Sequence, residues 1–107
     1  MAVHTELACG FLERVYKAAL RIEFEERGVV FKKEVRLPIE YRKRVLPLDY
    51  KVDFMCWQEI IIEVKASDAI HDRHVAQLIN YLHASKMKRG LLLNFGATCL
   101  QHKRVVN

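Results

Sequence analysis

Ile60-Ile61-Ile62-Glu63-Val64-Lys65 is the stretch of this chain that decides its fold. It is made of β-branched residues with one carboxylate and one terminal amine, a composition typical of a strand. Its nearly continuous apolar character predicts burial on both faces, in the middle of a sheet. Because side chains alternate along a strand, we expect Glu63 and Lys65 to share the face opposite to Ile62.

A second carboxylate, Asp53 in Val52-Asp53-Phe54, precedes Glu63 by ten positions. A short hairpin would bring Asp53 and Glu63 to one point. Two carboxylates suit a hard divalent cation, and a neighbouring amine suits a phosphate or a water that is losing its proton. The alternative is an exposed face on which Glu63 only pairs with Lys65. The apolar strand disfavours it, because burying an unpartnered carboxylate costs several kcal/mol.

The remaining residues alternate between helical and extended patterns. Apolar spacing predicts a helix over residues 5–27, in which Gly10 marks either a later helix start or a close approach of the backbone to another element. A second helix is expected to run to residue 85, capped by Ser67 or Asp68. Strands are predicted over residues 29–41, 45–55, 58–66, 89–95 and 100–106, the last at a sheet edge.

Further motifs surround the two carboxylates, in this order: Gly10-Phe11-Leu12-Glu13-Arg14-Val15-Tyr16, Gln77-Leu78-Ile79-Asn80-Tyr81, Gly90–Gly96 and Lys103–Val106. With Asp53 and Glu63-Val64-Lys65, they resemble the PD-(D/E)XK nuclease superfamily and, within it, the GxxExxY proteins. The resemblance implies an α/β fold in a single domain over residues 1–107. This domain would have a restriction-endonuclease-like αβββαβ core, with a mixed sheet flanked by helices.

The resemblance also implies an activity, the metal-dependent hydrolysis of phosphodiester bonds in nucleic acid, with DNA as the expected substrate. Asp53, Glu63 and the backbone carbonyl of Val64 would hold Mg²⁺ or Mn²⁺. Lys65 would orient the attacking water and stabilise charge on the phosphate. The further candidates for the catalytic pocket are Glu13, Gln77 and Tyr81.

These three further candidates lie on the predicted helices, and each has an ordinary alternative. Glu13 would be an outer metal ligand or a water-orienting group, although helix carboxylates are commonly just exposed. Gln77 and Tyr81 are four positions apart and share one helix face. The amide could bind a phosphate oxygen or orient Lys65, and the phenol could bind a phosphate. Both could equally pack at the edge of the core.

The charge of the chain fits a polyanionic partner. Lys and Arg number 18 against 13 Asp and Glu, a formal net charge of +5. The candidates for nucleic-acid contacts are Arg42, Lys43, Arg44, Lys86, Lys88 and Arg89. If they share the face of Asp53, they would contact phosphates rather than bases. The alternative is that these charges only keep the protein in solution. Two rival functions remain, a nucleic-acid-binding module with little activity and a protein-interaction subunit with an acidic partner. A homodimer would help so small a domain to cover a duplex.

Several other classes of site are disfavoured. The three cysteines form no C-x-x-C pair, so we expect a reducing cytoplasm and neither disulfides nor zinc. His71 and His74 lack an evident third ligand and are expected at the surface. Asn94, which ends a buried strand, should cap a turn. No apolar run reaches the roughly 18 residues of a membrane span, and no phosphate-binding glycine motif or G-x-S-x-G occurs.

Overall fold

The computed structural model describes residues 2–107. Its elements are α1 (Ala2–Leu7), α2 (Glu13–Glu26), β1 (Phe31–Tyr41), β2 (Arg44–Cys56), β3 (Ile60–Lys65), α3 (Asp72–Ser85), β4 (Arg89–Asn94) and β5 (Gln101–Val106). The strands form one sheet in the order β1-β2-β3-β4-β5. Only β3 and β4 run parallel. This mixed sheet confirms the predicted α/β fold, with β3 in the middle and β5 at an edge.

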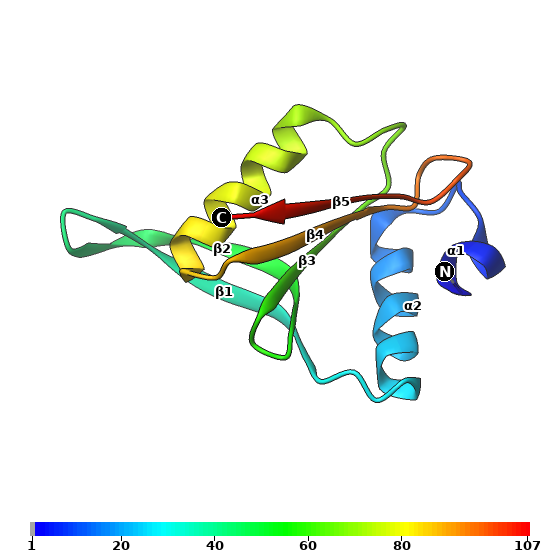
Figure 1. Cartoon of the computed structure of the whole chain (residues 1–107), viewed down its shortest axis with the longest axis horizontal. Coiled ribbons are helices and arrows are strands. Elements are labelled where there is room, and N and C mark those ends of the chain that lie inside the picture. The colour runs from blue at the N-terminus through cyan, green and yellow to red at the C-terminus, as the bar shows by residue number, and fades with distance from the viewer. Residues whose placement is uncertain (1) are drawn as a thin grey trace.

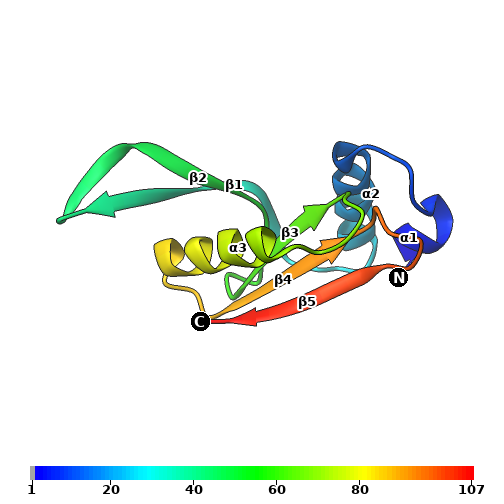
Figure 2. The same cartoon turned by 90° about the horizontal axis from the view of Figure 1, so that it is seen from above.

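Helices α2 and α3 cover opposite faces of the sheet (Figures 1 and 2). Ile62 of β3 packs in the cluster that contains Leu20 of α2. Ile61, its neighbour, packs in the other cluster, with Leu78 of α3. The predicted alternation along β3 is therefore confirmed. Glu63, two positions after Ile61, faces α3 by the same alternation. Within residues 2–107, no helix is long and apolar enough to cross a membrane.

The single helix predicted over residues 5–27 is wrong, because the chain breaks it into α1 and α2. The alternative of a later helix start near Gly10 is closer to the structure, since α2 begins at Glu13. Ala8 and Gly10 between them have φ angles of 58° and 106°, which a continuous helix cannot contain. The buried Tyr16 stabilises the break: its hydroxyl donates to the Ala8 carbonyl at 2.6 Å and accepts from the Phe11 N–H at 3.2 Å. Its ring stacks on Phe95 at a centroid distance of 4.8 Å.

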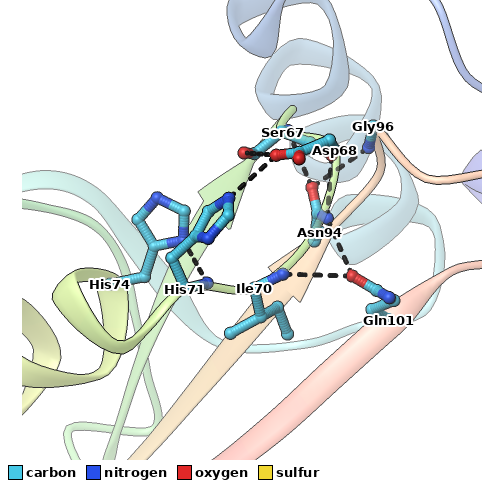
Figure 3. Close-up of polar contacts among 8 residues, drawn as sticks. All are labelled: Ser67, Asp68, Ile70, His71, His74, Asn94, Gly96 and Gln101. Atoms are coloured by element: carbon cyan, nitrogen blue, oxygen red, sulfur yellow. Dashed lines mark hydrogen bonds and ion pairs between the residues drawn. The ribbon is translucent and has the colours of Figure 1, made fainter.

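The predicted cap of the second helix is also wrong: α3 begins at Asp72, and its N-cap is His71 instead of Ser67 or Asp68. The reason lies in the buried Asn94, drawn in Figure 3. Its amide accepts from the Ser67 N–H at 2.9 Å and donates to the Ser67 carbonyl at 3.0 Å. The backbone at Ser67 is thus occupied by Asn94, and the helix starts later. Asn94 has the structural role that the sequence predicted.

Gly96 completes this connection. A Cβ atom at this position would lie 2.3 Å from the Ser67 carbonyl oxygen and 2.4 Å from its nitrogen. Only glycine allows so close an approach of two backbones. The segment that follows the Glu63-Val64-Lys65 strand is therefore held to the end of β4 by Asn94 and Gly96 together.

Candidate active site

The sheet opens at Asp53. The ladder between β2 and β3 ends at the pair of Phe54 with Ile62, one residue after Asp53. Val52 packs in the core cluster under α3, whereas Phe54 packs in the cluster under α2. Because residues two apart in a regular strand share a face, β2 must turn over at Asp53. The carboxylate of Asp53 therefore lies at an irregularity of the strand, where the ladder no longer occupies its backbone.

Side chains replace the missing ladder bonds at this point. The Glu63 carboxylate accepts the Asp53 N–H at 2.9 Å, and the Asp53 carboxylate accepts the Val64 N–H at 2.8 Å. Glu63 is only 3% exposed, and the side chain of Asp53 is 11% exposed. The structure therefore brings the two carboxylates together at one protected point, as the sequence predicted.

The two carboxyl groups do not ionise independently. Burial raises the pKa of Glu63 to about 8, and the negative charge of Asp53 adds to the rise. The hydrogen bond from the Asp53 N–H and the charge of Lys65 oppose it. Glu63 therefore keeps its proton near neutral pH when no cation is bound. A divalent cation at this point would stabilise both ionised carboxylates.

Lys17 of α2 is a site residue that sequence reasoning missed. Its Nζ lies 2.8 Å from Asp53 Oδ1 and 3.1 Å from Glu13 Oε1. Burial by itself lowers the pKa of Lys17, but the bonds to Asp53 and Glu13 outweigh it, and the net pKa is raised. Glu13, which was predicted at the edge of the site, thus reaches Asp53 through Lys17. The four-residue spacing from Glu13 to Lys17 was the available signal.

Lys65 and Gln77 meet on the α3 side of the sheet. Lys65 Nζ donates a hydrogen bond to Gln77 Oε1 at 3.1 Å. Tyr81, one helical turn after Gln77, is 7% exposed and packs against Tyr50 at a ring distance of 4.9 Å. Burial raises the pKa of Tyr81 to about 12, and the negative charge of Glu63 adds to this rise. Tyr81 therefore remains a hydrogen-bond donor within the electrostatic field of the carboxylates.

The donor set fits a hard cation with few protein ligands. In residues 2–107, no group of three or more His, Cys, Asp or Glu side chains is placed to hold a metal ion. Asp53 and Glu63 supply two carboxylates, and the backbone of Val64 lies beside them. Mg²⁺ commonly binds one or two protein carboxylates and keeps several waters. The buried pair with its raised Glu63 pKa is therefore compatible with Mg²⁺ or Mn²⁺.

The predicted basic contacts lie elsewhere on the molecule. Arg42 and Lys43 form the turn between β1 and β2, at the tip of a hairpin that projects past the other three strands of the sheet (Figure 2), and Arg44 begins β2. Arg89 pairs with Ile60, at the opposite end of β3 from the catalytic candidates. The two remaining candidates for nucleic-acid contacts, Lys86 and Lys88, lie on the connection between α3 and β4. The structure does not gather these residues around Asp53, and their binding role stays a prediction.

The chain resembles known proteins both in sequence and in fold. A family model of the PD-(D/E)XK nuclease superfamily matches residues 1–105. Among solved structures, the chain resembles the one described as the crystal structure of SSO0001, with a TM-score of 0.71 and 18% sequence identity. The match covers 88% of this chain and 49% of that one, so this chain spans about half of its length. This likeness supports the fold. No curated protein matches the chain.

Proposed function

Because the chain belongs to the PD-(D/E)XK nuclease superfamily, we propose that it is a metal-dependent nuclease that hydrolyses phosphodiester bonds in nucleic acid. We take DNA as its substrate. The observation that carries the proposal is the convergence of Asp53 and Glu63 where β2 and β3 separate. Nucleases of this superfamily generally use divalent metals, and two buried carboxylates fit one.

Each residue of the site would have a defined task. Asp53, Glu63 and the Val64 carbonyl would hold Mg²⁺ or Mn²⁺, which lowers the pKa of water and neutralises phosphate charge when bound. Lys65 would orient the attacking water and stabilise the charge that develops on the phosphate. Gln77 would position Lys65, because its amide oxygen accepts the hydrogen bond of the Lys65 ammonium at 3.1 Å.

The remaining candidates would act from the two helices. Glu13 would bind the cation from the outer side or orient a water, since Lys17 already connects it to Asp53. The Tyr81 phenol would donate a hydrogen bond to a phosphate, because its raised pKa keeps it protonated. We also assign the chain to the GxxExxY proteins, on the motif Gly10–Tyr16, whose glycine and tyrosine form the break between α1 and α2.

The test is cleavage of plasmid and single-stranded DNA with Mg²⁺ or Mn²⁺. Asp53→Asn and Glu63→Gln are the variants of choice, since an amide keeps an oxygen to accept the backbone N–H that each carboxylate binds. We expect each to lower the rate by about 100-fold or more. Glu59→Gln is the matched control, because Glu59 is exposed on the turn between β2 and β3, and it should cleave as the wild type does.

Three other results would contradict the proposal. Nicking that survives both Asp53→Asn and Glu63→Gln would come from a contaminating nuclease. Binding of DNA without cleavage under either metal would indicate the nucleic-acid-binding module. Absence of binding even at low salt would favour the protein-interaction subunit, because phosphate contacts are strongest there.

A further inference from the structure

A cavity of about 350 Å³ lies beside Asp53, between α2 and the β1–β2 hairpin. Four cationic side chains line it, from Arg14, Lys17, Arg21 and Lys33. The carboxylates at its wall belong to Glu34 and Asp53. Because Asp53 belongs both to this cavity and to the carboxylate pair, the cavity borders the candidate active site at Asp53.

The sequence of α2 builds one wall of this cavity. Arg14, Lys17 and Arg21 are spaced by three and four residues, so they lie on one face of the helix. Ala18, on the same face, leaves room between them. None of these residues belongs to the core cluster that α2 shares with the sheet. This basic face therefore serves the cavity and not the packing of the helix.

The cations of the cavity differ in their partners. Lys17 contacts Asp53 and Glu13, and Arg21 lies 3.4 Å from Glu25. Arg14 and Lys33 form no ion pair or side-chain hydrogen bond with any of residues 2–107. Two unpaired cations that share one concave surface repel each other, and an anion between them would remove this repulsion.

The strand wall is distorted at the same level. The ladder pairs Lys33 with Phe54 and Val35 with Val52, while Glu34 between them has a φ of 52°. A non-glycine residue at positive φ is strained, and such strain concentrates at functional sites. Glu34 lies opposite Asp53. Both β1 and β3, the strands on either side of β2, therefore depart from regular pairing next to Asp53.

We propose that this cavity binds a phosphate group of the nucleic-acid strand, next to the phosphate that is cleaved, with Arg14 and Lys33 as its principal contacts. The inference rests on the proposed function and adds to it how the strand is held. Its chemistry is the pairing of a guanidinium and an ammonium with phosphate oxygens. Such contacts fix the register of a strand without reading its bases.

The test measures binding of a short single-stranded DNA by fluorescence anisotropy in Ca²⁺ and in EDTA, over a range of salt. The double variant Arg14→Gln/Lys33→Gln should raise the Kd by about tenfold or more and reduce the salt slope by about one. Lys32→Gln/Lys51→Gln is the control, because it removes the same charge from two other exposed residues outside the cavity. The control should change the Kd by less than about threefold.

Three strand types identify the source of the phosphate: a circular strand, a linear strand with a 5′-phosphate, and one with a 5′-hydroxyl. An equal loss of affinity on all three supports an internal phosphate, and a loss confined to the phosphorylated end supports a terminal one. The conservative double variant Arg14→Lys/Lys33→Arg should bind DNA about as tightly as the wild type, because it keeps both positive charges. Circular dichroism of each variant separates misfolding from lost contacts.

The inference and the proposed function fail in different ways. The inference would be overturned if Arg14→Gln/Lys33→Gln bound DNA as tightly as the wild type, or if the control lost as much affinity. Either result would leave the proposed nuclease intact, provided that cleavage still depends on Asp53. A selective loss of binding in a protein that never cleaves would support the phosphate subsite and contradict the nuclease.

Discussion

The carboxylate of Glu63 accepts a hydrogen bond from the backbone N–H of Asp53 at 2.9 Å, where the ladder between β2 and β3 has ended. The carboxylate of Asp53 in turn accepts a hydrogen bond from the backbone N–H of Val64 at 2.8 Å. Each acid of the candidate site thus also connects two strands. The protonation of Glu63 and the stability of the fold are therefore coupled. A cation bound at this point would be coupled to both, and the coupling can be measured.

The free energy of unfolding should fall as the pH rises from 4.5, the usual pKa of Glu63, to about 8, its pKa in the folded chain. Between these values the folded chain keeps a proton that the unfolded chain has released, so a higher pH favours unfolding. The slope should approach about 1.4 kcal/mol per pH unit. Urea denaturation at several pH values measures it. Glu63→Gln cannot titrate and should lose this part of the slope. The same slope in both proteins would contradict the assignment.

Binding of Mn²⁺ should strengthen as the pH rises toward the pKa of Glu63, about 8. The carboxylate must lose its proton to bind a metal, so the apparent affinity should rise by up to about tenfold per pH unit below that value. The increase in melting temperature caused by Mn²⁺ should therefore be larger at about pH 8 than at about pH 6. Glu59→Gln should behave as the wild type. An increase that does not depend on pH would mean that Mn²⁺ binds elsewhere.

Removal of the Lys17 ammonium should tighten Mn²⁺ binding. This group neutralises Asp53 and Glu13, so it would compete with a cation for the same oxygens. Lys17→Met should lower the stability of the metal-free protein by about 1 kcal/mol or less, because the pair is partly exposed, and should lower the Kd for Mn²⁺ several-fold. Calorimetric titration measures the Kd, with Lys32→Met as the control. Weaker binding by Lys17→Met would show that the lysine supports the metal site.

Gln77 should act through Lys65. Gln77→Ala is expected to reduce cleavage by about tenfold and to leave the Kd for Mn²⁺ unchanged, because its contact is with the Lys65 ammonium. Lys65→Met should reduce cleavage by about 100-fold or more. In the Lys65→Met background, Gln77→Ala should have almost no further effect on the rate. Additive losses in the double variant would mean that Gln77 has a separate role, for instance in binding a phosphate.

Gly96→Ala should destabilise the fold by about 1–3 kcal/mol. Its new Cβ would meet the backbone of Ser67 at 2.3 Å, and backbone cannot move aside at low cost. Gly90→Ala is the matched comparison, because its Cβ would meet the side chain of Leu78 at 2.9 Å, which can shift. We expect a smaller loss for Gly90→Ala in urea denaturation. Equal losses would show that the close approach at Gly96 is not the cause.

The convergence of the two carboxylates and the central place of β3 could be predicted, and some helix boundaries could not. The alternation of Glu63 with its apolar neighbours is a local pattern, and it was found as predicted. The start of α3 depends on Asn94, 27 residues beyond the Ser67 that it binds. The end of α1 depends on a hydroxyl of Tyr16, which lies beyond the break. Helix propensity depends on residues that are close in sequence, so it does not reveal the effect of hydrogen-bond partners that are far away in the chain.

The amino-acid sequence by itself determined that β3 is a central strand, which residue types make up the candidate site, and the family to which the chain belongs. Periodicity reveals the central strand because it acts over a few residues, and the resemblance of the motifs indicates the family and the site residues. Only the tertiary structure placed Lys17 on Asp53, at 2.8 Å across 36 positions of chain, and put Arg14 and Lys33 around one cavity. It also moved the most basic turn, Arg42 and Lys43, to the hairpin tip. Contacts between distant elements arise from packing, which decides what each charge faces.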